Sequence, residues 1–226
     1  MQIIQQWHCF ESPAQVAQAA CDAIMRAAQQ AIMARGCFKL VLAGGLTPER
    51  VYQLLAKQQS DWSKWRIYYG DDRCLPADHS QRNSVMAQRA FLDHVSIPSA
   101  QVFTMPTELG NLHAARLYQQ VVADAMPFDL VLLGMGDDGH TASLFPDHDT
   151  PSEALVHAVF NAPKFPPERI SLSATALSNT RRVFFMITGA EKQTAVQQWK
   201  SGVQLPVSRI APAEGIEIYI DSAALG

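Results

Sequence analysis

The chain has 226 residues, 48% of them apolar, and a formal net charge of −3. This length and composition suffice for one substantial core, so we expect a single domain over residues 1–226. With only 17% charged residues and no basic excess, the composition argues against nucleic acid or an anionic membrane as partner, and local groups must hold any anionic ligand.

Helical and extended patterns alternate along the first half of the chain. Residues 12–35 carry apolar side chains at helical spacing, with Ser12 and Pro13 suited to a helix start and Gly36 to its end. Further along we expect a strand at 38–43, a helix after Pro48, a strand at 66–70, a polar loop at 71–83 and helices ending near 91 and 122.

The second half continues the alternation. We expect strands at 128–133, 169–173, 183–188 and 216–220 and a helix at 191–199, whereas the proline-rich segment 150–167 reads as a surface loop or lid. The pattern predicts one three-layer α/β domain, with a mainly parallel, Rossmann-like sheet covered by helices on both faces. Ligands of such sheets bind beyond the carboxyl ends of the strands, where two glycine-rich loops fall here.

The first of these loops, Gly44-Gly45-Leu46-Thr47-Pro48, suits a phosphate. Glycines let backbone N–H groups approach an anion, and Thr47 as N-cap with Pro48 in the first helical position would begin a helix that favours negative charge. A strand-to-helix turn without a ligand explains the same residues. The loop is not a Walker loop, because no Gly-Lys-Ser/Thr follows. Candidate counter-charges are Arg73, Arg169 and Lys192.

The second loop runs from Gly134 to Pro146 and contains His140. Its glycines match the spacing of a dinucleotide site, but two aspartates would meet the pyrophosphate and Pro146 interrupts the helix that such a site needs. His140 is a candidate general base or acid, because imidazole exchanges protons near neutral pH. Asp71 or Asp138 are candidates to orient its ring. A surface histidine in a polar turn is the simpler alternative.

Two other chemistries fit less well. A metal site built from the acidic and histidine residues of this region matches no standard ligand spacing; its members would be Asp137, Asp138, His140, His148 and Asp149. Ser143 lacks the Gly-x-Ser-x-Gly setting of a serine nucleophile. A third polar cluster, Asp71-Asp72-Arg73, leaves a strand and gains interest only from its coincidence with the two loops.

The cysteines and the N-terminus bear on the compartment. Cys9, Cys21, Cys37 and Cys74 show neither a Cys-x-x-Cys pair nor metal-finger spacing, so we expect reduced, buried thiols. The N-terminus lacks the pattern of a secretory signal, and no apolar run reaches the roughly 18 residues of a membrane span. We therefore expect a cytoplasmic protein without membrane contacts.

Taken together, these segments resemble the 6-phosphogluconolactonase family, within the superfamily that also holds glucosamine-6-phosphate deaminase. The resemblance rests on AGGLTP at 43–48, DDRCLPADHSQRN at 71–83, GMGDDGHTASLFP at 134–146, ERISLSATAL at 168–177 and the TGAEK run ending at Lys192. The TASLFP ending is the lactonase form. Ala43 and Leu46 replace serines common in the family, Asp72 replaces a glutamate and Arg82 a serine, which puts any reach-dependent role of the shorter Asp72 in doubt.

The resemblance implies a site and a reaction. His140 would activate water as the base, with Asp71 and Arg73 lining the site, while the substrate phosphate would be held by Gly44, Gly45, Thr47, Arg169 and Lys192. The implied reaction is hydrolysis of 6-phospho-D-glucono-1,5-lactone to 6-phosphogluconate in the oxidative pentose phosphate pathway, without cofactor or metal, by a monomer or weak homodimer. The rivals are an amino-sugar-phosphate deaminase or isomerase and a non-catalytic sugar-phosphate sensor.

Overall fold

The computed structural model describes residues 4–148 and 154–226. A six-stranded parallel sheet has the order β1-β9-β8-β5-β2-β3. Its strands are β1 (Gln5–Phe10), β2 (Phe38–Leu42), β3 (Trp65–Tyr69), β5 (Phe128–Leu133), β8 (Thr180–Ile187) and β9 (Ile216–Asp221). The predicted parallel α/β sheet is confirmed, and β1 is an additional strand that the sequence did not predict.

The burial of the strands explains which of them the sequence reveals. All six residues of β5, in the interior of the sheet, are buried, as expected for a parallel strand covered on both faces. By contrast β1 pairs only with β9 at one edge and has no fully buried residue. An edge strand of this kind carries no continuous apolar run that would identify it.

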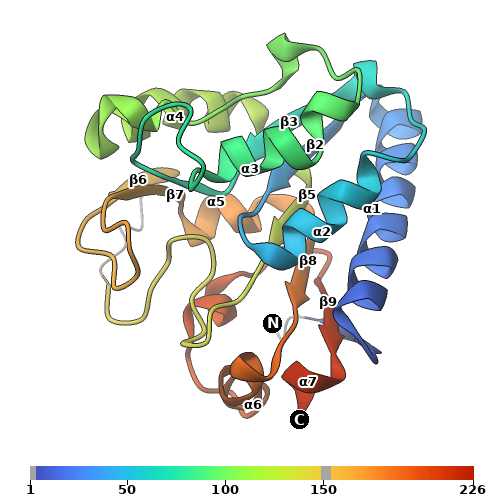
Figure 1. Cartoon of the computed structure of the whole chain (residues 1–226), viewed down its shortest axis with the longest axis vertical. Coiled ribbons are helices and arrows are strands. Elements are labelled where there is room, and N and C mark those ends of the chain that lie inside the picture. The colour runs from blue at the N-terminus through green and yellow to red at the C-terminus, as the bar shows by residue number, and fades with distance from the viewer. Residues whose placement is uncertain (1–3, 149–153) are drawn as a thin grey trace.

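Helices cover both faces of this sheet. Figure 1 shows α1 (Pro13–Arg35) and α2 (Leu46–Leu55) on one side of the strands and α4 (Asn111–Ala125) and α5 (Ala174–Ser178) on the other. The remaining α-helices are α3 (Asn83–Ala90), α6 (Gln193–Lys200) and α7 (Ser222–Leu225). The start of α1 is as predicted, because the Ser12 side chain accepts from the backbone N–H of Gln15.

A second, antiparallel sheet was not predicted. It has the order β4-β7-β6 and consists of β4 (Asp71–Arg73), β7 (Arg169–Leu172) and β6 (Val156–Val159). The expectation of a polar loop at 71–83 was therefore wrong at its start, and that of a loop or lid at 150–167 was wrong at β6. Residues 149–153 of that segment lie outside the described residues. Strands of three or four residues that carry polar side chains give too short a pattern to recognise.

The four cysteines differ in exposure. Only Cys21 is fully buried; Cys9 is exposed and Cys37 and Cys74 are partly exposed, so the prediction that all four thiols are buried was wrong, although all four are free. Among the helices of the described residues, none is long and apolar enough to cross a membrane.

Candidate active site

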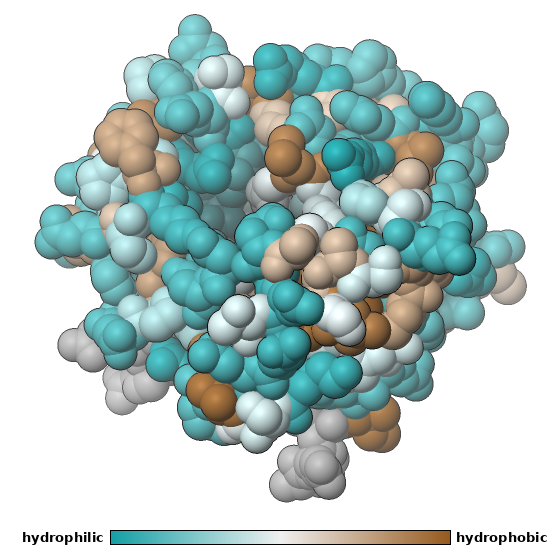
Figure 2. Space-filling model, turned by 60° about the horizontal axis from the view of Figure 1, so that its bottom comes forward, coloured by the Kyte–Doolittle hydropathy of each residue, from teal (hydrophilic) through white to brown (hydrophobic). Residues whose placement is uncertain are grey.

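A polar pocket lies beyond the carboxyl ends of β2, β3 and β5, where ligands of parallel sheets bind. Its volume is about 200 Å³. Figure 2 brings this side of the molecule forward and shows it hollowed and lined mainly by hydrophilic residues. The pocket brings together all but one of the predicted site residues, namely Gly44, Gly45, Asp71, Arg73, His140, Arg169 and Lys192. The exception is Thr47.

His140 makes its closest polar contact with Asp138. Its Nδ1 lies 2.5 Å from Asp138 Oδ1, which also accepts the backbone N–H of His140 at 3.0 Å. A carboxylate accepts hydrogen bonds, so we assign the ring proton to Nδ1, which leaves the Nε2 lone pair as the basic atom. Of the two carboxylates proposed to orient this ring, Asp138 is therefore the one in contact with it.

Burial and the hydrogen bonds between the two residues shift the pKa values of His140 and Asp138. Burial lowers the pKa of His140 below 6.5, and the hydrogen bond and charge of Asp138 oppose this shift only in part. For Asp138, burial acts to raise the pKa, but hydrogen bonds from the backbone and ring of His140 outweigh it and the pKa is lowered. At neutral pH the pair is consequently an ionised carboxylate beside a neutral imidazole, the protonation state that a general base requires.

The loop around His140 is shaped by glycine rather than by a helix. A Cβ atom at Gly136 would lie 1.9 Å from His140 Nδ1, so only glycine leaves room for the ring. Gly139 has a φ of +78°, and the backbone N–H of Gly136 donates to the carbonyl of His140 at 2.8 Å. Residues 134–148 form turns, without the helix that a dinucleotide site would place at the pyrophosphate.

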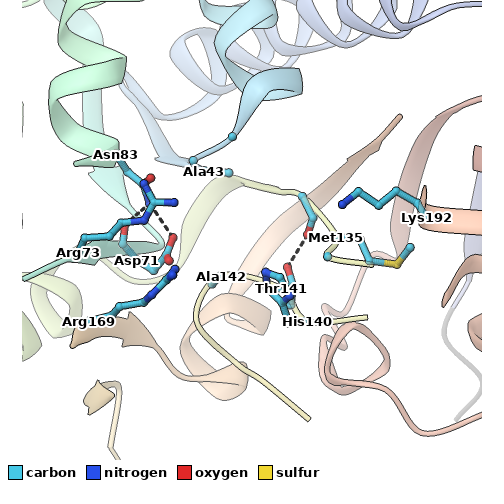
Figure 3. Close-up of a pocket in the computed structure, with 14 residues that line it drawn as sticks. Ala43, Asp71, Arg73, Asn83, Met135, His140, Thr141, Ala142, Arg169 and Lys192 are labelled. Carbon is cyan, nitrogen blue, oxygen red and sulfur yellow. Dashed lines mark hydrogen bonds between the residues drawn. The ribbon is translucent and has the colours of Figure 1, made fainter. Parts of the chain in front are cut away.

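The opposite wall of the pocket carries Asp71. Asn83, the first residue of α3, donates through Nδ2 to Asp71 Oδ1 at 3.0 Å, and Ser143 Oγ donates to Asp71 Oδ2 at 2.6 Å. Figure 3 shows Asp71, Asn83, Arg73 and Arg169 grouped on this side, with Lys192 across the pocket. Sequence reasoning did not single out Asn83 as a site residue; its only signal was its place at the end of the third polar segment.

The two arginines are held differently. Arg73 Nη1 donates to the carbonyl of Gln81 at 2.5 Å, whereas its Nε is buried without a hydrogen-bond partner among the described residues. Arg169 is 5% exposed and donates to the carbonyls of Pro166 at 3.0 Å and Lys164 at 2.8 Å. Burial lowers the pKa of Arg169 below its usual range, with the charge of Asp71 opposing the shift.

Thr47 does not cap α2. The helix begins at Leu46 with Gly45 as N-cap, and Thr47 Oγ1 instead forms a hydrogen bond of 2.6 Å with Thr188 Oγ1. The capping role predicted for Thr47 was therefore wrong. Thr47 borders a neighbouring cavity of about 460 Å³ that shares Gly44, Gly45 and Lys192 with the pocket.

Asp72, whose role was in doubt, faces away from the pocket. Its buried carboxylate accepts the backbone N–H of Asn83 at 2.7 Å and the Ser84 hydroxyl at 2.7 Å, and it pairs with Arg82 Nε at 3.3 Å. These contacts anchor the first turn of α3. The aspartate that replaces the family's glutamate thus positions the helix that carries Asn83.

One group of side chains has the composition of a cation site. Donor atoms of Asp137, Asp138 and His140 lie within 4.8 Å of one another. However, Asp137 pairs with Lys164, and Asp138 is engaged by His140. Asp149, which completed the metal alternative in the sequence, lies outside the described residues.

Solved structures share this fold over nearly the whole chain. A crystal structure of 6-phosphogluconolactonase from Thermotoga maritima has a TM-score of 0.91 at 27% identity and covers 97% of this chain and 100% of its own. A monomeric glucosamine-6-phosphate deaminase has a TM-score of 0.84 at 20% identity, with 97% and 98% covered, which concerns the fold alone. The fold class is thus the three-layer α/β architecture that both kinds of protein share.

Sequence relatives narrow the class to a family. The family described as glucosamine-6-phosphate isomerases/6-phosphogluconolactonase matches residues 11–219. A 6-phosphogluconolactonase of Mycobacterium leprae is 40% identical over 205 residues, 84% of this chain and 83% of the relative. One from Synechocystis is 38% identical over 177 residues, 74% and 73% of the two chains. The chain belongs to the glucosamine-6-phosphate isomerase/6-phosphogluconolactonase family.

Proposed function

We propose that this protein hydrolyses 6-phospho-D-glucono-1,5-lactone to 6-phosphogluconate, with His140 as the base that activates water. The observation that carries the proposal is the contact of His140 with Asp138 in a pocket that also holds Asp71, Arg73 and Lys192. Membership of the family and relatives named 6-phosphogluconolactonase support the same reaction.

The two proton transfers can use one imidazole. His140 Nε2 takes a proton from water as the oxygen attacks the lactone carbonyl, and the resulting imidazolium is stabilised by Asp138. The tetrahedral intermediate then expels the ring oxygen, which takes the proton back from Nε2. The ring opens to a hydroxy acid that ionises, so each turnover releases one proton to the solution.

Charge that develops on the carbonyl oxygen needs a donor. Arg73 is the strongest candidate, because its guanidinium lines the pocket and, among the described residues, forms a hydrogen bond only through Nη1. Backbone N–H groups of the loop at 134–142 are the alternative donors. Neither a metal ion nor a covalent intermediate is required for an ester as reactive as a lactone.

The phosphate is proposed to bind at the Lys192 end. Gly44 and Gly45 border both cavities there, and α2 begins directly after them, so its N-terminus favours an anion. Thr47 lines the second cavity, as Lys192 does. Arg169, also predicted to hold the phosphate, lies beside Asp71 across the pocket (Figure 3). A rise in KM for the phosphorylated lactone in Arg169→Ala, without an effect on unphosphorylated gluconolactone, tests its proposed contact with the phosphate.

The test is acid release from lactone generated in situ, measured with a pH indicator against the spontaneous rate. Wild type should accelerate hydrolysis, and His140→Ala should lose about two decades or more of turnover, the usual scale for loss of a general base. Unchanged turnover in His140→Ala would remove His140 from the mechanism. Release of ammonia from glucosamine 6-phosphate would instead favour the deaminase alternative.

The protein is proposed to act as a monomer or weak homodimer on a small-molecule substrate. Sedimentation at assay concentrations tests this, and an obligate larger assembly would contradict it.

A further inference from the structure

The carboxylate of Asp71 is held by two neutral side chains from different loops. Asn83 Nδ2 donates to one oxygen at 3.0 Å and Ser143 Oγ to the other at 2.6 Å. Both donors are buried, with 3% and 1% of their surface exposed. Because neither donor carries a charge, the pair fixes the carboxylate in place and leaves its negative charge intact.

Asn83 also sets the distance between Asp71 and the first glycine-rich loop. Its Nδ2 makes a second hydrogen bond, of 2.9 Å, to the backbone carbonyl of Asp71. A Cβ atom at Gly44 would lie 2.0 Å from Asn83 Oδ1, so the first glycine-rich loop can lie this close to Asn83 only because residue 44 is glycine. One amide side chain therefore spaces the phosphate-binding loop and the carboxylate.

Ser143 connects Asp71 to the loop that carries His140, three residues earlier. The backbone N–H of Ser143 donates to Ser171 Oγ at 3.2 Å, and Ser171 is the residue opposite Asp71 in the pairing of β4 with β7. The hydroxyl of Ser143 and its backbone thus fasten the His140 loop to the second sheet at the position of Asp71.

We propose that Asn83 and Ser143 are positioning residues that hold Asp71 as a charged acceptor for one hydroxyl group of the lactone ring. The inference rests on the proposed function, which supplies a substrate rich in hydroxyl donors. Each carboxylate oxygen can accept two hydrogen bonds and receives one, Oδ1 from Asn83 and Oδ2 from Ser143, so each can accept one more from a substrate in the pocket. Asp71 lines the pocket but does not contact the His140 ring, whose Nδ1 bonds to Asp138, so recognition and proton transfer are separate.

The experiment compares two serine-to-aspartate hydrogen bonds, one at the pocket and one away from its lining. Ser143→Ala removes the donor to Asp71, and Ser63→Ala removes a donor of 2.5 Å to Asp61. For each protein, kcat/KM is measured on the lactone and on analogues that lack the hydroxyl at C2, C3 or C4. The melting temperature of each variant is recorded alongside.

Wild type should lose about tenfold to a hundredfold in kcat/KM on one analogue, the scale for a hydrogen bond to a charged group. Ser143→Ala should lose a similar factor on the full lactone and little more on that analogue, because the same interaction is already gone. Ser143→Thr, which keeps the hydroxyl, should retain the discrimination, and Ser63→Ala should behave as wild type.

Asn83→Asp is the second variant, of nearly unchanged size, and it replaces the donor to Asp71 with a second carboxylate. It should lose the same discrimination, and it decides the matter if Ser143→Ala does not fold. Wild-type discrimination among the analogues in folded Ser143→Ala or Asn83→Asp would overturn the inference. A wild-type protein that hydrolyses no lactone at all would instead overturn the proposed function.

Discussion

His157 should make the protein lose stability in mild acid. This residue lies in β6, is 5% exposed, and neither ring nitrogen has a hydrogen-bond partner among the described residues. Burial lowers its pKa from 6.5 to about 4. Between these pH values His157 is protonated in the unfolded chain but not in the folded one. The free energy of unfolding therefore falls as the pH drops from about 6.5 to about 4, and above that window His157 causes no pH dependence.

The size of the effect follows from the two pKa values. One pKa unit corresponds to about 1.36 kcal/mol, so the whole window from 6.5 to about 4 costs roughly 3 kcal/mol. Between about pH 7.5 and about pH 5 the loss is about 2 kcal/mol. That is a large fraction of the roughly 5 to 15 kcal/mol by which domains are stable.

Urea unfolding followed by tryptophan fluorescence measures this loss in wild type and in His157→Leu. Other groups also titrate, but the difference between the two proteins isolates His157. It should change by about 2 kcal/mol between the two pH values. At the higher pH the leucine variant should be at least as stable as wild type, since it removes two unpaired polar atoms.

His113, which is exposed on α4, supplies the matched control. His113→Gln should follow wild type at both pH values. A difference between wild type and His157→Leu that stays constant with pH would refute the reasoning, because it would mean that His157 finds a partner for its proton in the folded state.

Three further predictions concern the pocket. Asp138→Asn should lower kcat by at least about tenfold, because the ring of His140 loses its orienting acceptor. The negative charge of Asp138 raises the pKa of His140, so its loss should also move the acid limb of the plot of kcat/KM against pH, which in wild type lies below 6.5, to lower pH. Gly136→Ala would place a Cβ 1.9 Å from His140 Nδ1, so turnover should fall without a matching rise in KM, as steady-state kinetics would show; wild-type turnover would contradict the close packing. Lys192→Ala should raise KM for the phosphorylated lactone by about tenfold or more and leave unphosphorylated gluconolactone unaffected; an equal effect on both substrates would exclude a phosphate contact.

Apart from β1, the strands of the main sheet were predictable because most of their residues are buried. The run Phe128–Leu133 is apolar apart from Asp129, and Gly134 follows it directly, so the limits of this strand were predicted correctly. The second sheet was missed because β4 and β6 contain three and four residues, with polar side chains in both. Both strands are recognisable only by their pairing with β7. In the case of β4 this partner lies about a hundred residues later in the chain, so the local sequence pattern does not reveal the pairing.

The site was predictable at the level of loops but not of contacts. The sequence placed His140 beside Asp138 and left Asp71 as an equal candidate to orient it. What decides between them is the backbone turn built on Gly136 and Gly139, which folds Asp138 back onto the ring. Likewise Asn83 was inconspicuous in the sequence, because its importance arises from the approach of Gly44, a distant segment.

The pocket exists because the chain passes from one sheet to the other at Gly70. β3 ends at Tyr69 in the parallel sheet and β4 begins at Asp71 in the antiparallel one, while Gly70 bonds to Leu42 of the first sheet at 2.9 Å and to Leu172 of the second at 2.8 Å. The parallel sheet therefore supplies the glycine-rich loops and His140, and the short sheet supplies the charged wall that includes Asp71. A substrate that fills the pocket must contact both sheets, so residues that fasten them together, such as Ser143, should influence catalysis without touching the reacting atoms.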